Sequence, residues 1–316
     1  MGTEKKDRPF GTHWQSMLFM PSSNRLSLLS NAYDGITWDG YVSKLDEKML
    51  VVQKDNPGLG GGSLLVSTPV DGDDEGITGA FDRGYLVTYD SRLNEKSKLP
   101  VHEGIITGMV PGNGGRFVTT CSTDQSISQV DLNTGATRKR IGTAHLSHVL
   151  SIDALPSNDS NLFITCGKDK EIVTWDLRDR LSGSYYAYCN SCPSAVQYCE
   201  RDEQYFVVGT YDSHLMLFDT RNNRTEVQSR SMECKRITKI RRIPIPAAAA
   251  AAGVTCGLMA VMSDHNVVSI VKELSLGSVY QGSSIHTGII TDLQVIRGEV
   301  FTIGHGIQHL VQHTLP

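Results

Sequence analysis

The chain has 316 residues, a formal net charge of −4 at pH 7, 39% apolar residues and 30 glycines. This composition excludes a disordered chain, and it argues against direct nucleic-acid binding, which usually requires a basic surplus. No apolar run approaches the roughly 18 residues of a membrane span, and the charged N-terminus lacks a signal-peptide core. We therefore expect a protein of the cytoplasm and nucleus, without a membrane partner, whose seven cysteines are reduced thiols.

The N-terminal part of the chain contains a charged tail and one conspicuous aromatic segment. Residues 1–9 are mostly charged or polar, and we expect them to form a flexible tail. Farther along, Trp38 lies between Gly35 and Gly40 and is followed by Tyr41. A large aromatic residue at a glycine-flanked turn is a candidate anchor for a protein partner, so we take Trp38, Gly35, Gly40 and Tyr41 as candidate partner-binding residues. The alternative is an indole folded over the edge of its own sheet, and the sequence leaves both possibilities open.

The most regular segment runs from residue 144 to residue 179. It contains His145, a strand-like stretch over Val149–Leu155, a polar turn, a second strand over Leu162–Cys166, and a turn at Asp169. A third strand follows and ends in Trp175 and an aspartate. This order of three strands and two turns predicts one antiparallel unit of an all-β protein.

The turn aspartate of this unit recurs along the chain. The intervals between equivalent positions are 48, 42, 45, 43, 52 and 42 residues, and these positions are Asp34, Asp82, Asp124, Asp169, Asp212, Asp264 and Gly306. The longest interval contains the Ala247–Ala252 tract, which we interpret as a loop insertion. A repeat of about 40–45 residues resembles the WD-repeat family, whose repeats are blades of four strands. The resemblance implies an all-β, seven-bladed WD-repeat β-propeller over residues 10–316.

In this family a blade is held together by a chain of hydrogen bonds. A histidine, the turn aspartate, a Ser or Thr of the second strand and the Trp indole are its members, and each buried polar atom must be paired. The fourth blade supplies all four in His145, Asp169, Thr165 and Trp175. Other blades supply only part of the chain: His102, Thr120 and Asp124 with Val130 in place of Trp in the third, Asp212 in the fifth, and His286 with Gly306 in place of Asp in the seventh.

Propellers close by joining the two ends of the chain, which removes exposed sheet edges. We therefore predict that a strand near Phe10–Met20 joins the terminal blade, residues 289–315, and closes it. The segment Leu310–Leu315 is expected to be another strand of that blade.

Three remaining features have a structural and a functional interpretation. The pair Cys189 and Cys192 could be half a zinc site, but no second pair stands at zinc-module spacing, so we favour a structural role. The basic stretch Lys235–Arg242 could touch an acidic tail or nucleic acid, and we favour a solvated face. Histidines 305, 309 and 313 could be metal ligands, but we expect no metal, no cofactor and no catalytic residue.

The resemblance extends to the WD-repeat subunits of the methylosome, which accompany the protein arginine methyltransferase that makes symmetric dimethylarginine. It is carried by the run Gly35–Gly40, by the fourth blade through Trp175, and by the ending from Phe301 to Pro316. The resemblance implies a non-catalytic adaptor that binds and activates such a methyltransferase in a hetero-oligomer, with Trp38 in a pocket of the enzyme. It also implies that arginine-rich substrates, such as Sm proteins and histones, are presented on the free surface, which a mildly acidic propeller suits.

Two other classes of function stay open at this point. WD-repeat propellers also serve as substrate receptors of ubiquitin-ligase complexes, and a propeller scaffold could associate with RNA through the Lys235–Arg242 stretch. An enzyme is the least expected class, because the turn aspartates and histidines recur from blade to blade, whereas an active site occurs once.

Overall fold

The computed structural model describes residues 13–313 except 21–22, 34–35, 46–50, 69–75, 113, 158–160, 179–182, 201, 223, 235, 244–256, 265, 283–285, 287, 297–298 and 305–309. The described residues form 27 strands, one 3-10 turn at Asp82–Gly84 and no α-helix. Consequently, none of them belongs to a helix that could cross a membrane. The predicted tail over residues 1–9 and the turn positions Asp34 and Gly306 lie outside the described residues.

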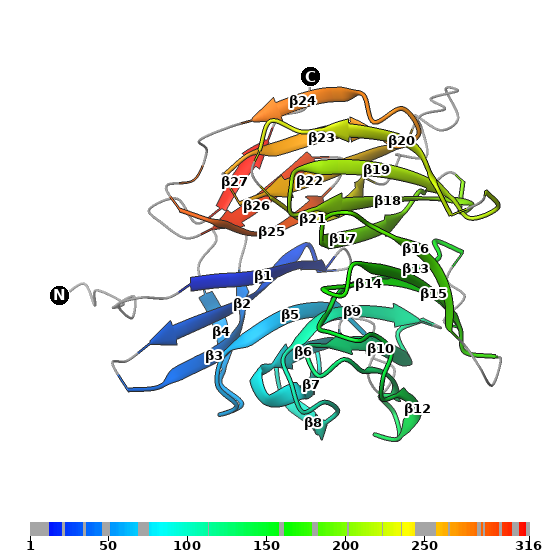
Figure 1. The fold of residues 1–316 in the computed structure, drawn as a ribbon. Coiled ribbons are helices and arrows are strands. Elements are labelled where there is room, and N and C mark those ends of the chain that lie inside the picture. The colour runs from blue at the N-terminus through cyan, green and yellow to red at the C-terminus, as the bar shows by residue number, and fades with distance from the viewer. Residues whose placement is uncertain are drawn as a thin grey trace.

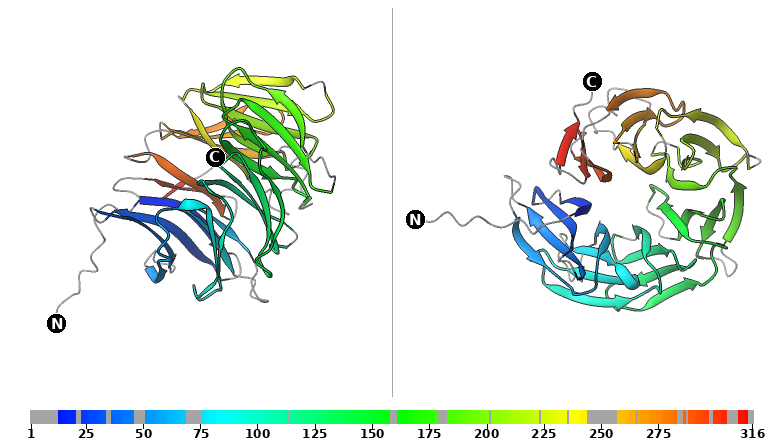
Figure 2. Two further views of the ribbon diagram at one scale, coloured as in Figure 1. Left: turned by 60° about the horizontal axis from the view of Figure 1, so that its bottom comes forward. Right: turned by 60° about the vertical axis from the view of Figure 1, so that its left-hand side comes forward.

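The strands form seven antiparallel sheets, which stand as blades around a central axis in the order of the chain (Figures 1 and 2). Blade one contains β1 (His13–Met20), β2 (Arg25–Tyr33), β3 (Trp38–Leu45) and β4 (Val51–Asp55). Blade two contains β5 (Gly62–Ser67), β6 (Ile77–Phe81), β7 (Tyr85–Tyr89) and β8 (Glu95–Pro100). Blade three contains β9 (Ile106–Gly112), β10 (Phe117–Ser122), β11 (Ile127–Asp131) and β12 (Thr137–Ile141).

The second half of the ring repeats the same arrangement. Blade four contains β13 (Val149–Ala154), β14 (Leu162–Gly167), β15 (Glu171–Asp176) and β16 (Gly183–Tyr188). Blade five contains β17 (Pro193–Tyr198), β18 (Tyr205–Thr210), β19 (His214–Asp219) and β20 (Glu226–Ser231). Blade six contains β21 (Ile237–Ile243), β22 (Leu258–Ser263), β23 (Val268–Lys272) and β24 (Ser278–Gly282). Blade seven contains β25 (Ile290–Ile296), β26 (Glu299–Gly304) and β27 (Leu310–His313). The predicted seven-bladed propeller is confirmed.

The aspartate that marks the repeat lies at the tight turn between the second and third strands. The residue after it has a left-handed backbone, with φ between 63° and 72°, in Arg83, Gln125, Lys170 and Ser213. The Asp169 carboxylate accepts the Glu171 N–H, which stabilises this turn. In blade six the left-handed residue is Asn266, so Asp264 stands one position before the place that Asp169 holds in blade four.

A second feature that recurs is a β-bulge near the start of each innermost strand. In four of these strands the hydroxyl of the bulged residue donates to a carbonyl of the next blade's inner strand, whereas the Thr238 hydroxyl of β21 donates to the Met262 carbonyl of its own blade. The four bonds between blades run from Ser63 to Ile106 (2.9 Å), Thr107 to Val149 (2.7 Å), Ser194 to Ile237 (2.5 Å) and Thr291 to Trp14 (2.5 Å). The last of them links blade seven to blade one and closes the ring.

The predicted pairing of the N-terminal strand with the terminal blade is wrong. β1 instead pairs with β2 over its whole length, as the inner strand of blade one. Without β1, blade one would consist of β2, β3 and β4 alone. β1 meets blade seven through side chains: Asp292 accepts hydrogen bonds from the Ser16 hydroxyl (2.8 Å) and the Met17 N–H (3.0 Å).

The core lies between the blades, because each sheet buries both faces against its neighbours. Blades four and five, for example, share one apolar cluster that includes Ile164, Ile172, Phe206 and Phe218. Since this packing repeats around the ring, the connections between strands lie outside the core, at the two ends of the disc.

Candidate functional site

One end of the disc, here called the top face, holds the turns between second and third strands and the connections between blades. Antiparallel pairing places all of these segments at the same end, and a contact in blade four shows it directly. His145 precedes the first strand of that blade, and its Nδ1 lies 3.0 Å from both carboxylate oxygens of Asp169, which follows the second.

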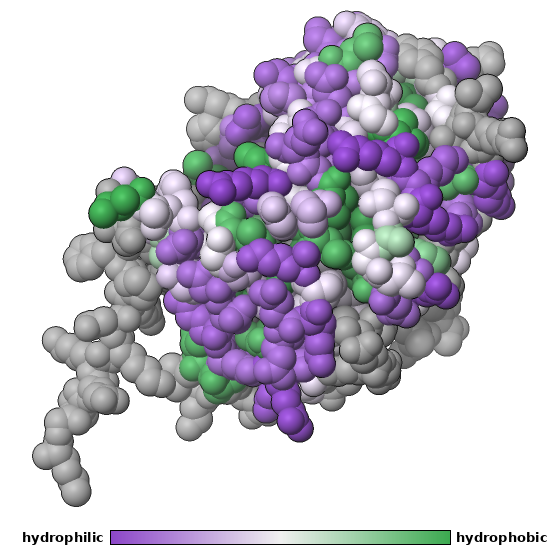
Figure 3. Space-filling view, turned by 90° about the horizontal axis from the view of Figure 1, so that it is seen from below, coloured by the Kyte–Doolittle hydropathy of each residue, from purple (hydrophilic) through white to green (hydrophobic). Residues whose placement is uncertain are grey.

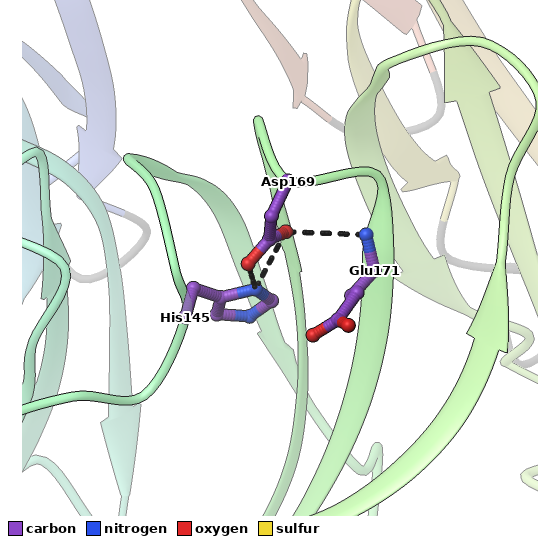
Figure 4. A group of neighbouring side chains, drawn as sticks. All are labelled: His145, Asp169 and Glu171. Carbon is purple, nitrogen blue, oxygen red and sulfur yellow. Dashed lines mark hydrogen bonds and ion pairs between the residues drawn. The ribbon is translucent and has the colours of Figure 1, made fainter.

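Blade four contains the complete predicted network. The His145 Nε2 lies 2.8 Å from the Thr165 hydroxyl, and the Trp175 indole N–H donates to the same hydroxyl at 2.8 Å. Figure 4 shows the Asp169 carboxylate facing the His145 ring, with Glu171 beside them. The ligand atoms of these three side chains lie within 4.8 Å of one another, as a metal site would require. Both ring nitrogens of His145 are already in hydrogen bonds, however, so the group belongs to the blade's internal network.

Blade three has the same network without the indole. The His102 Nε2 lies 2.8 Å from the Thr120 hydroxyl, and its Nδ1 lies 3.1 Å from Asp124. Burial acts to raise the pKa of Asp124, but hydrogen bonds from Ser126 and the Glu103 N–H outweigh it and lower the pKa to about 2. The carboxylate therefore stays ionised at neutral pH.

Blade five departs from the pattern, as predicted. The Asp212 carboxylate accepts the Thr210 hydroxyl at 2.5 Å and lies 3.3 Å from His214. Both Asp212 and His214 are far more exposed than the blade-four pair, because no buried histidine covers this turn.

Blade seven contains a substitution that the sequence did not reveal. The His286 Nε2 lies 2.8 Å from the Thr302 hydroxyl, and the His313 Nε2 lies 2.9 Å from the same hydroxyl. His313 thus takes the place of the indole of blade four. Burial and the neighbouring His286 lower the pKa of His313 to about 4. The sequence shows His313 eleven residues after Thr302, but only the pairing of β26 with β27 shows that the two side chains meet.

Exposed apolar side chains are concentrated on the top face. Of the thirteen large apolar side chains that are exposed among the described residues, eight lie on the top face: Tyr33, Ile36, Trp38, Ile105, Leu146, Tyr188, Tyr211 and Ile289. Four others lie on the outermost strands, and Leu274 lies on a turn at the opposite end. Seen from the side of β8 and β12, the surface is mostly hydrophilic (Figure 3). An exposed apolar set of this kind on one face marks a protein-interaction surface. Ile105 and Ile289 each stand three residues after a blade histidine, a recurrence that could have identified this face in advance.

The top face of blade one carries an aromatic cluster around Trp38, the first residue of β3. The indole is 48% exposed, and its ring centroid lies 5.6 Å from that of Tyr33 and 5.7 Å from that of His13. Ile36 in the preceding turn is 88% exposed. The two alternatives for Trp38 are therefore both partly met, because the indole rests on its own blade and still presents about half of its surface.

The other candidate partner-binding residues do not join this cluster. Gly35 lies outside the described residues. Gly40 is buried, and its N–H donates to the Gly60 carbonyl at 2.7 Å, so it permits close packing of the connection to blade two. Tyr41 lies on the opposite face of β3 from Trp38, and the Lys54 ammonium sits 3.5 Å from its ring centroid.

The basic stretch is only in part the solvated face that was predicted, because the Arg236 side chain is 45% exposed but those of Lys239 and Arg242 are largely covered. β21 turns Lys239 toward the buried Asp292 carboxylate, and Arg242 lies 3.4 Å from Asp153 and 3.6 Å from Glu200. The bulge near the start of β21 and the acidic residues on neighbouring inner strands explain the difference, because these cations are neutralised inside the ring. Lys235 lies outside the described residues.

The thiols of Cys189 and Cys192 are free. Burial raises the pKa of the Cys189 thiol to about 12, and it raises that of Cys192 as well. Both groups are therefore protonated at neutral pH and are poor nucleophiles.

Comparison with known proteins agrees with this architecture. Residues 138–176 match the family model of the WD domain, G-beta repeat, a stretch that ends with the third strand of blade four. The chain is 25% identical over 147 residues to Methylosome protein WDR77 of Xenopus laevis, which covers 46% of this chain and 44% of that protein. It is also 25% identical over 151 residues to the WD repeat-containing protein 55 homologs of Drosophila erecta and Drosophila yakuba, covering 47% of this chain and 29% of each relative.

The matches thus span less than half the length of these relatives. The match to one repeat, the hydrogen-bond network of blade four and the seven sheets around one axis agree with one another. The chain is a seven-bladed β-propeller that contains a WD repeat.

Proposed function

We propose that this propeller is a non-catalytic adaptor that binds a protein arginine methyltransferase and presents arginine-rich proteins, such as Sm proteins and histones, to it. The observation that carries the proposal is the half-exposed indole of Trp38 on an apolar top face. The likeness to Methylosome protein WDR77 supports the choice of partner. Propellers of this type typically act as scaffolds for other proteins.

The aromatic cluster of blade one has the properties of an interface anchor. Tyr33 and His13 contact the indole from its own blade, so the ring is held in place before a partner arrives. A preorganised aromatic side chain loses little conformational entropy on binding and buries a large apolar area. Ile36 extends the apolar surface on the same turn.

The top face does not supply a set of groups in a catalytic arrangement. The buried histidines of blades three, four and seven are engaged in hydrogen-bond networks that recur from blade to blade. A function therefore has to be sought in binding, and the site supports an adaptor.

The experiment is affinity purification of the full chain followed by mass spectrometry, with Trp38→Ala as the matched control. We expect a protein arginine methyltransferase at stoichiometric amount with the wild type and a strongly reduced amount with the variant. A ubiquitin-ligase adaptor at stoichiometric amount in its place would replace the proposal with the receptor function.

A second assay tests which of the two proteins carries the methyltransferase activity. The isolated chain is expected to show no turnover of S-adenosylmethionine and to raise the rate of the co-purified methyltransferase on an arginine-rich protein. Turnover by the isolated chain would contradict the adaptor function.

A further inference from the structure

Blade seven has an open edge. Each of the first six blades contains four strands in the described part of the chain, whereas blade seven contains three. β27, its outermost strand, pairs with β26 on one side and with no described strand on the other. An unpaired strand edge presents a row of backbone N–H and C=O groups, which pair readily with a further strand. The edge of β27 is therefore a binding site for an extended segment.

The order of the strands along the chain indicates which segment this is. In the first six blades the outermost strand begins 10 to 12 residues before the innermost strand of the next blade, as from Gly183 to Pro193 and from Ser278 to Ile290. The blade that follows blade seven around the ring is blade one, whose innermost strand is β1. Twelve residues precede β1, which is enough for a strand of five residues and a connection.

The sequence before β1 also matches the sequence before β5. Residues 54–57 read Lys-Asp-Asn-Pro and span the end of β4, and residues 6–9 read Lys-Asp-Arg-Pro. The first run begins eight residues before Gly62, and the second begins eight residues before Trp14. Gly62 and Trp14 are equivalent, because each directly precedes the bulge of its inner strand. Residues 3–7 therefore hold the place in the sequence that β4 (Val51–Asp55) holds before blade two.

The composition of this segment is typical of the outermost strands of the ring. β8 and β12 consist largely of charged and polar residues, and most of their side chains are exposed. Residues 3–7 read Thr-Glu-Lys-Lys-Asp. A strand at the outside of a blade is held by backbone hydrogen bonds to its neighbour, so it needs no apolar side chain.

The strand pairing in blade one gives the register that the segment adopts on β27. In blade one, Leu29 pairs with Val42, which in turn pairs with Asp55 of β4. Ile303 holds the place of Leu29 in blade seven, because each is the partner of the first residue after the bulge. Since Ile303 pairs with Leu310, the equivalent of Asp55 lies opposite Leu310. That equivalent is the aspartate at position 7.

We propose that residues 3–7 form the fourth strand of blade seven, antiparallel to β27, with Lys6 opposite Val311 and Lys5 opposite Gln312. β1 stays the inner strand of blade one, and the residues between the two strands cross the seam of the ring. The proposal replaces the flexible tail expected for residues 1–9 with an ordered strand. It does not depend on the adaptor function.

The charges at the edge fit this register. The Gln312 amide donates to the Glu299 carboxylate at 2.6 Å, and Glu299 is exposed. Residues directly opposite one another in an antiparallel pair point to the same face of the sheet. The Lys5 ammonium therefore lies on the face that carries the Glu299 carboxylate, and opposite charges on neighbouring strands stabilise their pairing.

Disulfide trapping in the full chain tests the register. Lys6→Cys combined with Val311→Cys places two thiols on opposite residues, within reach of a disulfide. The matched control is Lys5→Cys combined with Val311→Cys, because side chains of adjacent strand residues point to opposite faces. After mild oxidation, peptide mapping by mass spectrometry should find the link in the first variant and not in the control.

Two results of the trapping would overturn the proposal. One is the absence of the link in the first variant, or equal links in both variants. The other is a link that joins two chains, seen as a dimer under non-reducing conditions, which would assign the edge of β27 to a second copy.

Hydrogen exchange tests the pairing without new thiols. Lys5→Pro combined with Lys6→Pro removes two consecutive amide N–H groups, one of which faces β27. Lys5→Ala combined with Lys6→Ala removes the same charges and keeps both amides. The amides of β27 should exchange about 10-fold faster in the proline variant than in the alanine variant, while those of β15 in blade four stay unchanged. Equal exchange of β27 in the two variants would contradict the fourth strand.

Discussion

The Lys239 ammonium of blade six contacts the Asp292 carboxylate of blade seven inside the ring. The same carboxylate accepts hydrogen bonds from Ser16 and Met17 of blade one. One buried side chain therefore joins the last two blades to the first. Burial opposes ionisation of Asp292, but Lys239 and the neighbouring Arg241 outweigh it and hold the pKa of this carboxyl below its usual range.

Removal of the charge at this junction should destabilise the ring. Asp292→Asn leaves the Lys239 ammonium, whose side chain is only 16% exposed, without its counterion. Removing one partner of a buried ion pair typically costs about 3–5 kcal/mol, so urea unfolding should show a loss of that size. The double variant with Lys239→Met should recover part of it. Arg178→Met, which breaks an exposed pair with Asp176, is the control and should change stability by less than about 1 kcal/mol.

The indole of Trp175 should contribute strongly to stability. It is 6% exposed, and its N–H is bonded to Thr165 inside blade four. Trp175→Ala leaves a cavity and removes one hydrogen bond of the Thr165 hydroxyl, and it should cost about 3–5 kcal/mol by thermal or urea unfolding. Trp175→Phe keeps most of the volume and should cost less, about 1–3 kcal/mol. An unchanged melting temperature in Trp175→Ala would show that the blade network does not hold the fold together.

Stability should depend on pH through His313. Its pKa is lowered to about 4 in the folded protein, below the value of about 6.5 of an unfolded chain. Between these two values the unfolded state binds a proton that the folded state does not, so stability falls as the pH is lowered from about 6.5 toward 4. His313→Trp introduces into blade seven the indole that blade four has at this position, and it should reduce the loss of stability with falling pH. Melting temperatures of the wild type and of His313→Trp, measured from pH 7.5 to 4.5, test this prediction. Parallel curves for the two proteins would contradict a lowered pKa of His313.

Trp38 should matter for binding and not for folding. Its indole is half exposed and contacts two other rings of its own blade. Trp38→Ala should weaken methyltransferase binding by about 30- to 1,000-fold, as truncation of an interface anchor costs about 2–4 kcal/mol. The melting temperature of the free propeller should change by only a few degrees. Tyr211→Ala, an exposed aromatic residue on the top face of blade five, is the control, and an equal loss there would contradict anchoring at blade one.

The sequence by itself determined the contacts that lie within one blade. His145, Thr165 and Trp175 fall within about thirty residues, and their spacing is fixed by strand and turn lengths that recur along the chain. The seven-fold repeat and the blade-four network could therefore be predicted before any coordinates. The exposure of Trp38 could not, because the same turn permits an indole that is buried or free.

The tertiary structure decided the contacts between blades. Ser16 and Asp292 are 276 residues apart, and Lys239 meets Asp292 from a neighbouring sheet, so no local pattern relates them. Gly40 acquires its packing role only when the connection to blade two lies against it. His313 replaces an indole only through the pairing of β26 with β27. A repeat specifies the interior of each blade, whereas the closure of the ring determines which side chains meet across blades and which remain exposed.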